Sequence, residues 1–156
     1  MITITIPGRG AITFQHIVLD YNGTLGCDGN LIPGVKERLN LLAENVKVHI
    51  ITADTFGLCK SSCREIKAVI HILTSATGGP EKEQYVETLG PEGVMAVGNG
   101  NNDALMLARA AVGVAVLGPE GTSTLALKAS DVVVNDINAG LDLLLNPKRL
   151  IATLRT

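Results

Sequence analysis

The residues with the clearest chemical potential surround Asp20, which follows the apolar run His16-Ile-Val-Leu19 and precedes Tyr21-Asn-Gly-Thr-Leu25. A carboxylate at the end of such a run can act as a nucleophile toward an electrophilic phosphorus, and it then needs a cation to offset its repulsion of a phosphate. Gly23 allows the chain to turn so that backbone N–H groups face an anion, and Thr24 offers a hydroxyl. Taken alone, Asp20 is also compatible with a residue that merely caps a turn.

Three further segments carry groups that suit phosphoryl chemistry. Thr52 ends an apolar segment with a hydroxyl that can donate to a phosphoryl oxygen, and Lys82 can supply a fixed positive charge to a carboxylate and a bound phosphate. Each is ordinary on its own, because threonines at strand ends and solvated lysines on helices are common. Gly98-Asn-Gly-Asn-Asn-Asp103 is more specific, since amide and carboxylate oxygens are ligands that Mg²⁺ accepts.

The elements that must position these groups alternate between strand and helix. The hydrophobic pattern predicts strands over 11–19, 46–51, 68–73, 93–97, 112–117 and 131–134, separated by helices that begin near Pro33 or cover 80–89, 105–110, 122–128 and 137–144. This alternation is typical of a Rossmann-like α/β sandwich of three layers, with a parallel sheet of five to six strands between two layers of helices. Ligands bind such sheets at the carboxyl ends of the strands, so Asp20, Thr52, Lys82 and the segment Asn99 to Asp103 are expected to converge at one edge.

The chain has 156 residues, the length of a single domain, so we expect one domain over 1–156. Residues 1–15 form an N-terminal extension, because Met1 to Ile6 alternates β-branched and polar residues and Pro7-Gly-Arg-Gly10 makes a turn before the next strand. The predicted β-hairpin carries edge strands that can pair with another chain. We therefore expect a homo-oligomer.

The overall composition limits the classes of partner. Hydrophobic residues make up 46% and the net charge is −2, which is globular composition without the basic excess of a nucleic-acid-binding protein. No apolar stretch is long enough to cross a membrane, and the N-terminus lacks the features of a secretory signal, so a cytoplasmic location is expected. Cys27, Cys59 and Cys63 are odd in number, which argues against a disulfide framework. Cys59 and Cys63 have the spacing of a metal pair, but we interpret them as small apolar residues on a helix.

Four of these segments together resemble the motifs of the haloacid dehalogenase-like (HAD-like) hydrolase superfamily. The segment from Asp20 to Leu25 resembles its first motif, Thr52 and Lys82 match the second and third, and the segment from Gly98 to Asp103 is similar to the fourth. Over roughly residues 14–135 the chain is most similar to the phosphorylation domain of P-type ATPases and their small soluble relatives. The spacing of the motifs leaves no room for a cap domain, so the resemblance implies a capless HAD-like phosphatase and not an ion pump.

The resemblance assigns a role to each matching position. It implies that Asp20 forms an aspartyl-phosphate, that Mg²⁺ is the cofactor, and that the substrate is a phosphorylated small molecule or a phosphorylated macromolecule. The implied catalytic residues are Asp20, Asn22, Thr52 and Lys82. The implied substrate-binding residues are Gly23, Thr52, Ala53, Lys82 and Asn102. The implied metal site comprises Asp20, the backbone carbonyl of Asn22, Asn99 and Asp103, the last supporting the metal through water or Lys82.

Two positions depart from the family pattern. Family phosphatases carry aspartate two residues after the nucleophile as general acid and base, whereas this chain has Asn22, which cannot exchange a proton. The fourth motif normally has aspartate where this chain has Asn99, which removes a negative charge from the metal site. The leading hypothesis is therefore a slow Mg²⁺-dependent phosphohydrolase, and the alternative is a non-catalytic or regulatory module that binds phosphate or a partner. A phospho-accepting receiver domain is disfavoured because no acidic pair precedes His16, and a dinucleotide-binding domain because the third glycine of its fingerprint is missing.

Overall fold

The computed structural model describes residues 1–54 and 57–156, and within them the core is a six-stranded parallel sheet. The strands are β3 (His16–Asp20), β6 (Lys47–Thr52), β7 (Val69–Ile72), β8 (Val94–Gly98), β9 (Val112–Val116) and β10 (Val132–Val134). Their spatial order is β10-β9-β8-β3-β6-β7. The chain therefore adds β6 and β7 on one side of β3 and returns to the other side for the last three strands. This confirms the predicted parallel α/β sheet.

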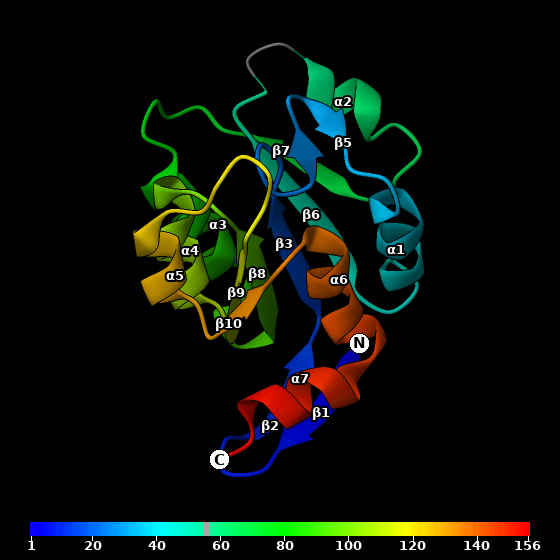
Figure 1. Ribbon diagram of the computed structural model, residues 1–156, viewed down its shortest axis with the longest axis vertical. Helices are drawn as coiled ribbons and strands as arrows, with labels where there is room; N and C mark the ends of the chain where they lie inside the picture. The colour runs from blue at the N-terminus through cyan, green and yellow to red at the C-terminus, as the bar shows by residue number, and fades with distance from the viewer. Residues whose placement is uncertain (55–56) are drawn as a thin grey trace.

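Helices cover both faces of the sheet (Figure 1). On one face lie α1 (Val35–Leu42) and α6 (Ile137–Leu145), and on the other lie α3 (Gly79–Leu89), α4 (Ala104–Arg109) and α5 (Thr124–Ala129). Each face has its own core, because residues alternate along a strand: Ile17 and Leu19 belong to one cluster and Val18 to the other. Burial on both faces explains why the strands read as apolar runs without alternation. The predicted three-layer arrangement is confirmed.

The strand predicted over 11–19 is two strands. The first part, β2 (Gly10–Phe14), pairs antiparallel with β1 (Ile2–Ile6), and after Gln15 the chain enters β3 in the parallel sheet. Gln15 lies at the break and already bonds to the neighbours of β3. Its backbone carbonyl accepts the amide of Lys47, the first residue of β6, and its amide donates to the carbonyl of Gly93, directly before β8. A continuous apolar pattern cannot show that its two halves pair with different neighbours.

A last helix, α7 (Pro147–Leu154), was not predicted. It packs against β1, where Ile4, Ile6 and Leu150 are buried. The hairpin and α7 lie at the opposite end of the molecule from the carboxyl end of β3 (Figure 1). The hairpin therefore covers part of its own chain and stands away from the edge at which the polar motifs end.

Short elements lie near the carboxyl edge of the sheet (Figure 1). They are β4 (Gly26–Cys27), β5 (Asn30–Leu31), α2 (Leu58–Ser62) and the 3₁₀ turn η2 (Asn101–Asp103), and a second 3₁₀ turn, η1 (Pro91–Gly93), precedes β8. The strand predicted over 68–73 is β7 (Val69–Ile72), which lies at the edge of the sheet, with Val69 and Ile72 exposed. No helix of the described residues is long and apolar enough to span a membrane.

Self-association through the hairpin remains a prediction. Deleting residues 1–10 would uncover the core, because Ile4 and Ile6 are buried, so we prefer the point variant Thr5→Lys on the exposed face of β1. A lysine on an edge strand disfavours pairing with a second chain. We expect the wild type to sediment as a dimer and Thr5→Lys as a monomer, while Thr88→Lys on α3 leaves the dimer intact. A wild-type monomer at micromolar concentration would contradict the prediction.

Candidate active site

A buried ion-pair triad lies at the carboxyl edge of the sheet. The Nζ atom of Lys82 donates to Oδ1 of Asp20 at 2.7 Å and to Oδ1 of Asp103 at 2.6 Å. Asp20 is the last residue of β3, Lys82 lies in the first turn of α3, and Asp103 ends the 3₁₀ turn that follows β8. All three side chains are buried. Three of the polar positions singled out by the sequence are therefore in direct contact.

The triad holds two carboxylates for one ammonium. Burial raises the pKa of Asp20 to about 7, and the neighbouring Asp103 carboxylate adds to this rise, while Lys82 opposes it. Burial acts to lower the pKa of Lys82, but the attraction of Asp20 and Asp103 outweighs it, so the pKa of Lys82 is raised. Lys82 therefore stays protonated at neutral pH, and Asp20 is the member that gains a proton as the pH falls.

This shift predicts a pH dependence of folding in the absence of metal. Asp20 holds a proton in the folded state up to about pH 7 but loses it near pH 3.8 in the unfolded chain, so the free energy of unfolding falls as the pH rises through that interval. The loss is roughly 2–4 kcal/mol and levels off above the interval. Urea unfolding at pH 5 and pH 8 checks this: Asp20→Asn should flatten the dependence and be the more stable protein at pH 8. An unchanged slope in Asp20→Asn would contradict the assignment.

A second set of contacts joins the first motif to the fourth. The Thr24 hydroxyl lies 3.0 Å from Oδ1 of Asn99 and 3.4 Å from Oδ2 of Asp20, so these two oxygens face the same hydroxyl. The Nδ2 group of Asn99 donates to the carbonyl of Gly121 at 2.9 Å. Gly23, with φ +78°, passes so close to the Asn99 side chain that a Cβ there would lie 2.5 Å from Nδ2. Position 23 therefore requires glycine for both its backbone conformation and its contact.

Asp103 is fully engaged inside the protein. Its Oδ2 accepts the backbone amides of Asn99 and Gly100 at 2.9 and 2.8 Å, while Oδ1 accepts Lys82. Gly98 makes this possible, because a Cβ at that position would lie 2.5 Å from Cγ of Asp103. Asp103 thus holds Lys82 and the loop after β8 in place.

The donor set near Asp20 fits a hard divalent cation. The free carboxylate oxygen of Asp20 and the amide oxygen of Asn99 are both within reach of the Thr24 hydroxyl, and oxygen is the ligand atom that such ions prefer. The backbone carbonyl of Asn22 belongs to the same loop. Since Asp103 is engaged elsewhere, it suits a supporting role better than direct ligation.

Other predicted positions have no hydrogen bond to the triad among the described residues. Thr52 is buried at the end of β6, one residue beyond the register partner of Asp20, and its hydroxyl accepts the amide of Asp54. Ala53 is exposed just beyond it, and Asn102 is exposed beside the start of α3. Asn22 is exposed after β3. Among the described residues, no hydrogen bond joins the side chains of these positions to Asp20.

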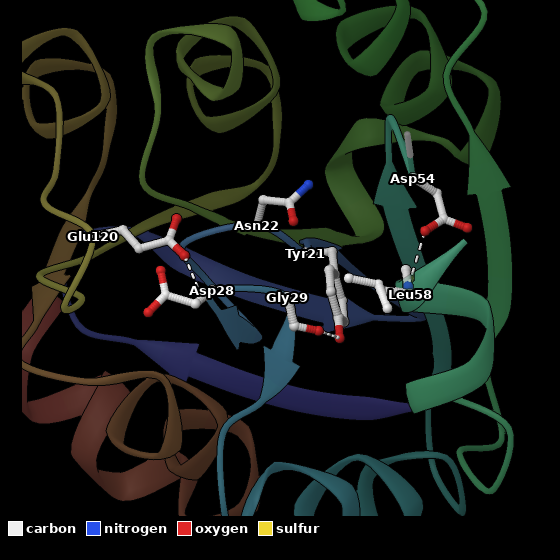
Figure 2. Close-up of a pocket in the computed structure, with 8 residues that line it drawn as sticks. Tyr21, Asn22, Asp28, Gly29, Asp54, Leu58 and Glu120 are labelled. Carbon is white, nitrogen blue, oxygen red and sulfur yellow. Dashed lines mark hydrogen bonds between the residues drawn. The ribbon is translucent and has the colours of Figure 1, made fainter. Parts of the chain in front are cut away.

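An open pocket of about 520 Å³ includes in its lining Tyr21 and Asn22, the two residues that follow Asp20 in the chain. Three acidic residues that were not among the predicted site residues also line it, namely Asp28, Asp54 and Glu120. Figure 2 shows Glu120 and Asp28 together on one side and Asp54 with Leu58 on the other, with Asn22 between. For Asp28 the sequence did carry a signal, because the dipeptide Asp28-Gly29 is typical of a two-residue hairpin turn. Both residues have left-handed φ (+50° and +81°) in the turn between β4 and β5.

Two curated proteins of Methanocaldococcus jannaschii are similar in sequence. Uncharacterized protein MJ0073 is 53% identical over 62 residues, which are 40% of this chain and 67% of that protein. Uncharacterized protein MJ0072 is 51% identical over 42 residues, which are 27% of this chain and 96% of that protein. No family model matches the chain. The chain covers two thirds or more of each of these proteins at high identity.

Solved structures share the fold over most of the chain. The cobalt-bound deoxy-D-mannose-octulosonate 8-phosphate phosphatase of Haemophilus influenzae has a TM-score of 0.72 at 11% identity, covering 92% of this chain and 94% of that one. The Moraxella catarrhalis 3-deoxy-D-manno-octulosonate 8-phosphate phosphatase, solved with magnesium, phosphate and KDO, has a TM-score of 0.65 at 19% identity over 91% and 94%. The catalytic domain of the CPx-ATPase CopB-B is 29% identical with a TM-score of 0.61, over 74% of this chain and 46% of that one. The chain therefore belongs to one family with MJ0073 and MJ0072, and it has the fold of the HAD superfamily hydrolases, without a cap domain in the described residues.

Proposed function

We propose that this chain is a Mg²⁺-dependent phosphohydrolase that acts through an aspartyl-phosphate on Asp20. The observation that carries the proposal is the buried Asp20–Lys82–Asp103 triad, which holds one carboxylate oxygen of Asp20 on Lys82 and leaves the other 3.4 Å from the Thr24 hydroxyl. A carboxylate oxygen of Asp20 attacks the phosphorus of a phosphomonoester as the bond from phosphorus to the leaving oxygen breaks, and the leaving oxygen takes its proton from water. Water then attacks the same phosphorus, which releases inorganic phosphate and restores the Asp20 carboxylate.

The surrounding residues supply charge and orientation. Lys82 offsets the negative charge of the attacking carboxylate and the phosphoryl group, in a water-poor site where such an interaction is strong. Thr52 contributes its hydroxyl to the phosphoryl oxygens, whereas the amides of Gly23 and Thr24 already donate to the carbonyls of Gly26 and Tyr21 within the turn. A Mg²⁺ ion bound by Asp20, the Asn22 carbonyl and Asn99 would offset the charge of the phosphate.

The proposed rate is low because Asn22 cannot serve as an acid or a base. The leaving alcohol has no positioned proton donor, and the water of the second step has no positioned base. Asn99 lowers the proposed rate further, since an amide oxygen ligates Mg²⁺ without contributing a negative charge to the metal site. Its Nδ2 contact with Gly121 gives the amide a structural role that an aspartate could not fill.

The direct test is hydrolysis of an aryl phosphate with and without Mg²⁺. We expect slow turnover that EDTA abolishes and that Asp20→Asn reduces to the uncatalysed rate. Glu44→Gln, an exposed change at the amino end of β6, is the matched control and should retain wild-type activity. Equal rates in wild type and Asp20→Asn, or full activity in EDTA, would contradict the proposal.

A non-catalytic or regulatory module is the second candidate, and the amides at positions 22 and 99 favour it. Such a module would bind Mg²⁺ together with inorganic phosphate, or a phosphorylated partner, and release it unchanged. Calorimetry with Mg²⁺ and phosphate, run beside the hydrolysis assay, distinguishes the two. Binding that depends on Asp20 and Lys82 without any turnover supports the module, whereas product formation that depends on Asp20 supports the enzyme.

A further inference from the structure

The pocket beside Asp20 is placed to receive the part of a substrate that leaves with the ester oxygen. Tyr21 and Asn22 follow the nucleophile directly, and Asp54 lies two residues beyond Thr52, so the pocket opens over the carboxyl ends of β3 and β6 (Figure 2). Its volume of about 520 Å³ is within the usual range for small-molecule sites. A phosphoryl group at Asp20 would therefore direct its leaving group into this space.

The pocket has a strongly one-sided charge. Among the described residues that line it, Asp28, Asp54 and Glu120 bring three carboxylates, and no lysine, arginine or histidine is present. One oxygen of Glu120 accepts the amide of Asp28 at 2.7 Å, and one oxygen of Asp54 accepts the amide of Cys59 at 2.9 Å. Glu120 and Asp54 each have a second carboxylate oxygen that can bind a ligand.

Two of the acids stand close enough to share a cationic group. Carboxylate oxygens of Asp28 and Glu120 lie within 4.8 Å of each other, at a distance where two negative charges repel and a positive charge between them is attracted to both. An ammonium group offers three N–H donors for such a pair.

Separate turns hold this pair in place. Asp28 lies in the tight turn between β4 and β5. Glu120 lies in a loop whose Gly121 carbonyl accepts the side chain of Asn99 and whose Ser123 amide donates to the Asn99 carbonyl. Asn99 thus connects the loop that carries Glu120 to the oxygen set around Asp20.

From this geometry we infer that the preferred substrate, within the proposed phosphohydrolase function on which this inference rests, is a phosphomonoester whose leaving group carries a protonated amine. An amino alcohol or an amino sugar has that chemistry. A leaving group with a carboxylate would bring a further negative charge to three others, which is unfavourable in a partly enclosed pocket. The octulosonate phosphatases compared above are named for a sugar acid, whose carboxylate has the opposite charge to the amine inferred here.

The test compares three sugar phosphates of similar size that react at the same oxygen: glucosamine 6-phosphate, glucose 6-phosphate and 6-phosphogluconate. We expect kcat/KM to be highest for the amine and lowest for the acid, with an advantage of the amine over the neutral sugar on the order of ten-fold or more at low ionic strength. The double variant Asp28→Asn/Glu120→Gln should bring the ratio of amine to neutral sugar close to one. Glu44→Gln, which removes one negative charge at the amino end of β6, away from the pocket, should keep the wild-type ratio.

The outcomes separate the inference from the proposed function. Asp20-dependent hydrolysis of all three sugars at equal kcat/KM overturns the inference and leaves the phosphohydrolase standing. A preference for 6-phosphogluconate that grows with Mg²⁺ also overturns it, because a second cation would then occupy the acidic pair. If the protein hydrolyses none of the three sugar phosphates and no aryl phosphate, the proposed function itself is overturned.

Discussion

Replacing Asn22 with aspartate is expected to raise phosphatase activity by roughly 10²–10⁴-fold, the usual contribution of a positioned general acid and base. Asparagine and aspartate have the same shape, so the backbone carbonyl at position 22 stays in place while the side chain gains a titratable proton. Asn22 is exposed at the edge of the pocket, two residues after Asp20, where a substituted carboxyl can reach a leaving oxygen without repacking the core. The gain should be greatest for substrates with poor leaving groups, which most need a proton.

Steady-state rates plotted against the pKa of the leaving group measure this effect. The wild type should show a steep dependence and Asn22→Asp a shallow one. Asn45→Asp makes the same chemical change at an exposed position at the amino end of β6 and should leave the plot unaltered. The double variant Asp20→Asn/Asn22→Asp should stay inactive. Unchanged rates in Asn22→Asp, with Mg²⁺ still bound, would show that position 22 is not the missing acid and would favour the binding module.

Replacing Lys82 with methionine is expected to cost about 3–5 kcal/mol of unfolding free energy at pH 8, the typical cost of breaking a buried ion pair by removing one partner. Methionine keeps most of the volume but leaves the carboxylates of Asp20 and Asp103 buried side by side without their shared cation. The loss should shrink at pH 5, because Asp20 then carries a proton and its repulsion of Asp103 falls.

Urea unfolding without metal at the two pH values measures this loss. Lys36→Met is the control, since Lys36 pairs with Glu65 on the surface, where an ion pair contributes only about 0–1 kcal/mol. Adding Mg²⁺ should restore part of the stability of Lys82→Met, because a bound cation again offsets the Asp20 charge. A loss no larger than that of Lys36→Met would mean that the triad is hydrated in solution and does not act as a buried charge centre.

Much of the strand and helix arrangement could be predicted from local sequence patterns. Runs such as Gly93 to Val97 predicted buried strands, and their alternation with helices predicted a parallel sheet. In a parallel sheet all strands end at the same edge, which is why Asp20 and the loop after β8 were expected together there. These inferences succeed because strand period and the direction of parallel strands are properties of short segments.

The pairing of side chains depended on contacts between distant segments. Lys82 was expected near Asp20, but its position between Asp20 and Asp103 follows from the placement of β3 next to β8, with α3 packed against α4. The pattern over 11–19 could not reveal the break at Gln15, because only the choice of neighbouring strand separates β2 from β3.

The acidic pocket shows the same limit most clearly. Asp28, Asp54 and Glu120 come from three loops far apart in the chain, and each reads in the sequence as an ordinary solvated carboxylate. Their common pocket depends on turns and long-range hydrogen bonds, such as that from Asn99 to Gly121. Residue type and period set which segments become strands and which side chains end them, whereas the charge that surrounds a substrate is set by how loops from different strands approach one another once the sheet has formed.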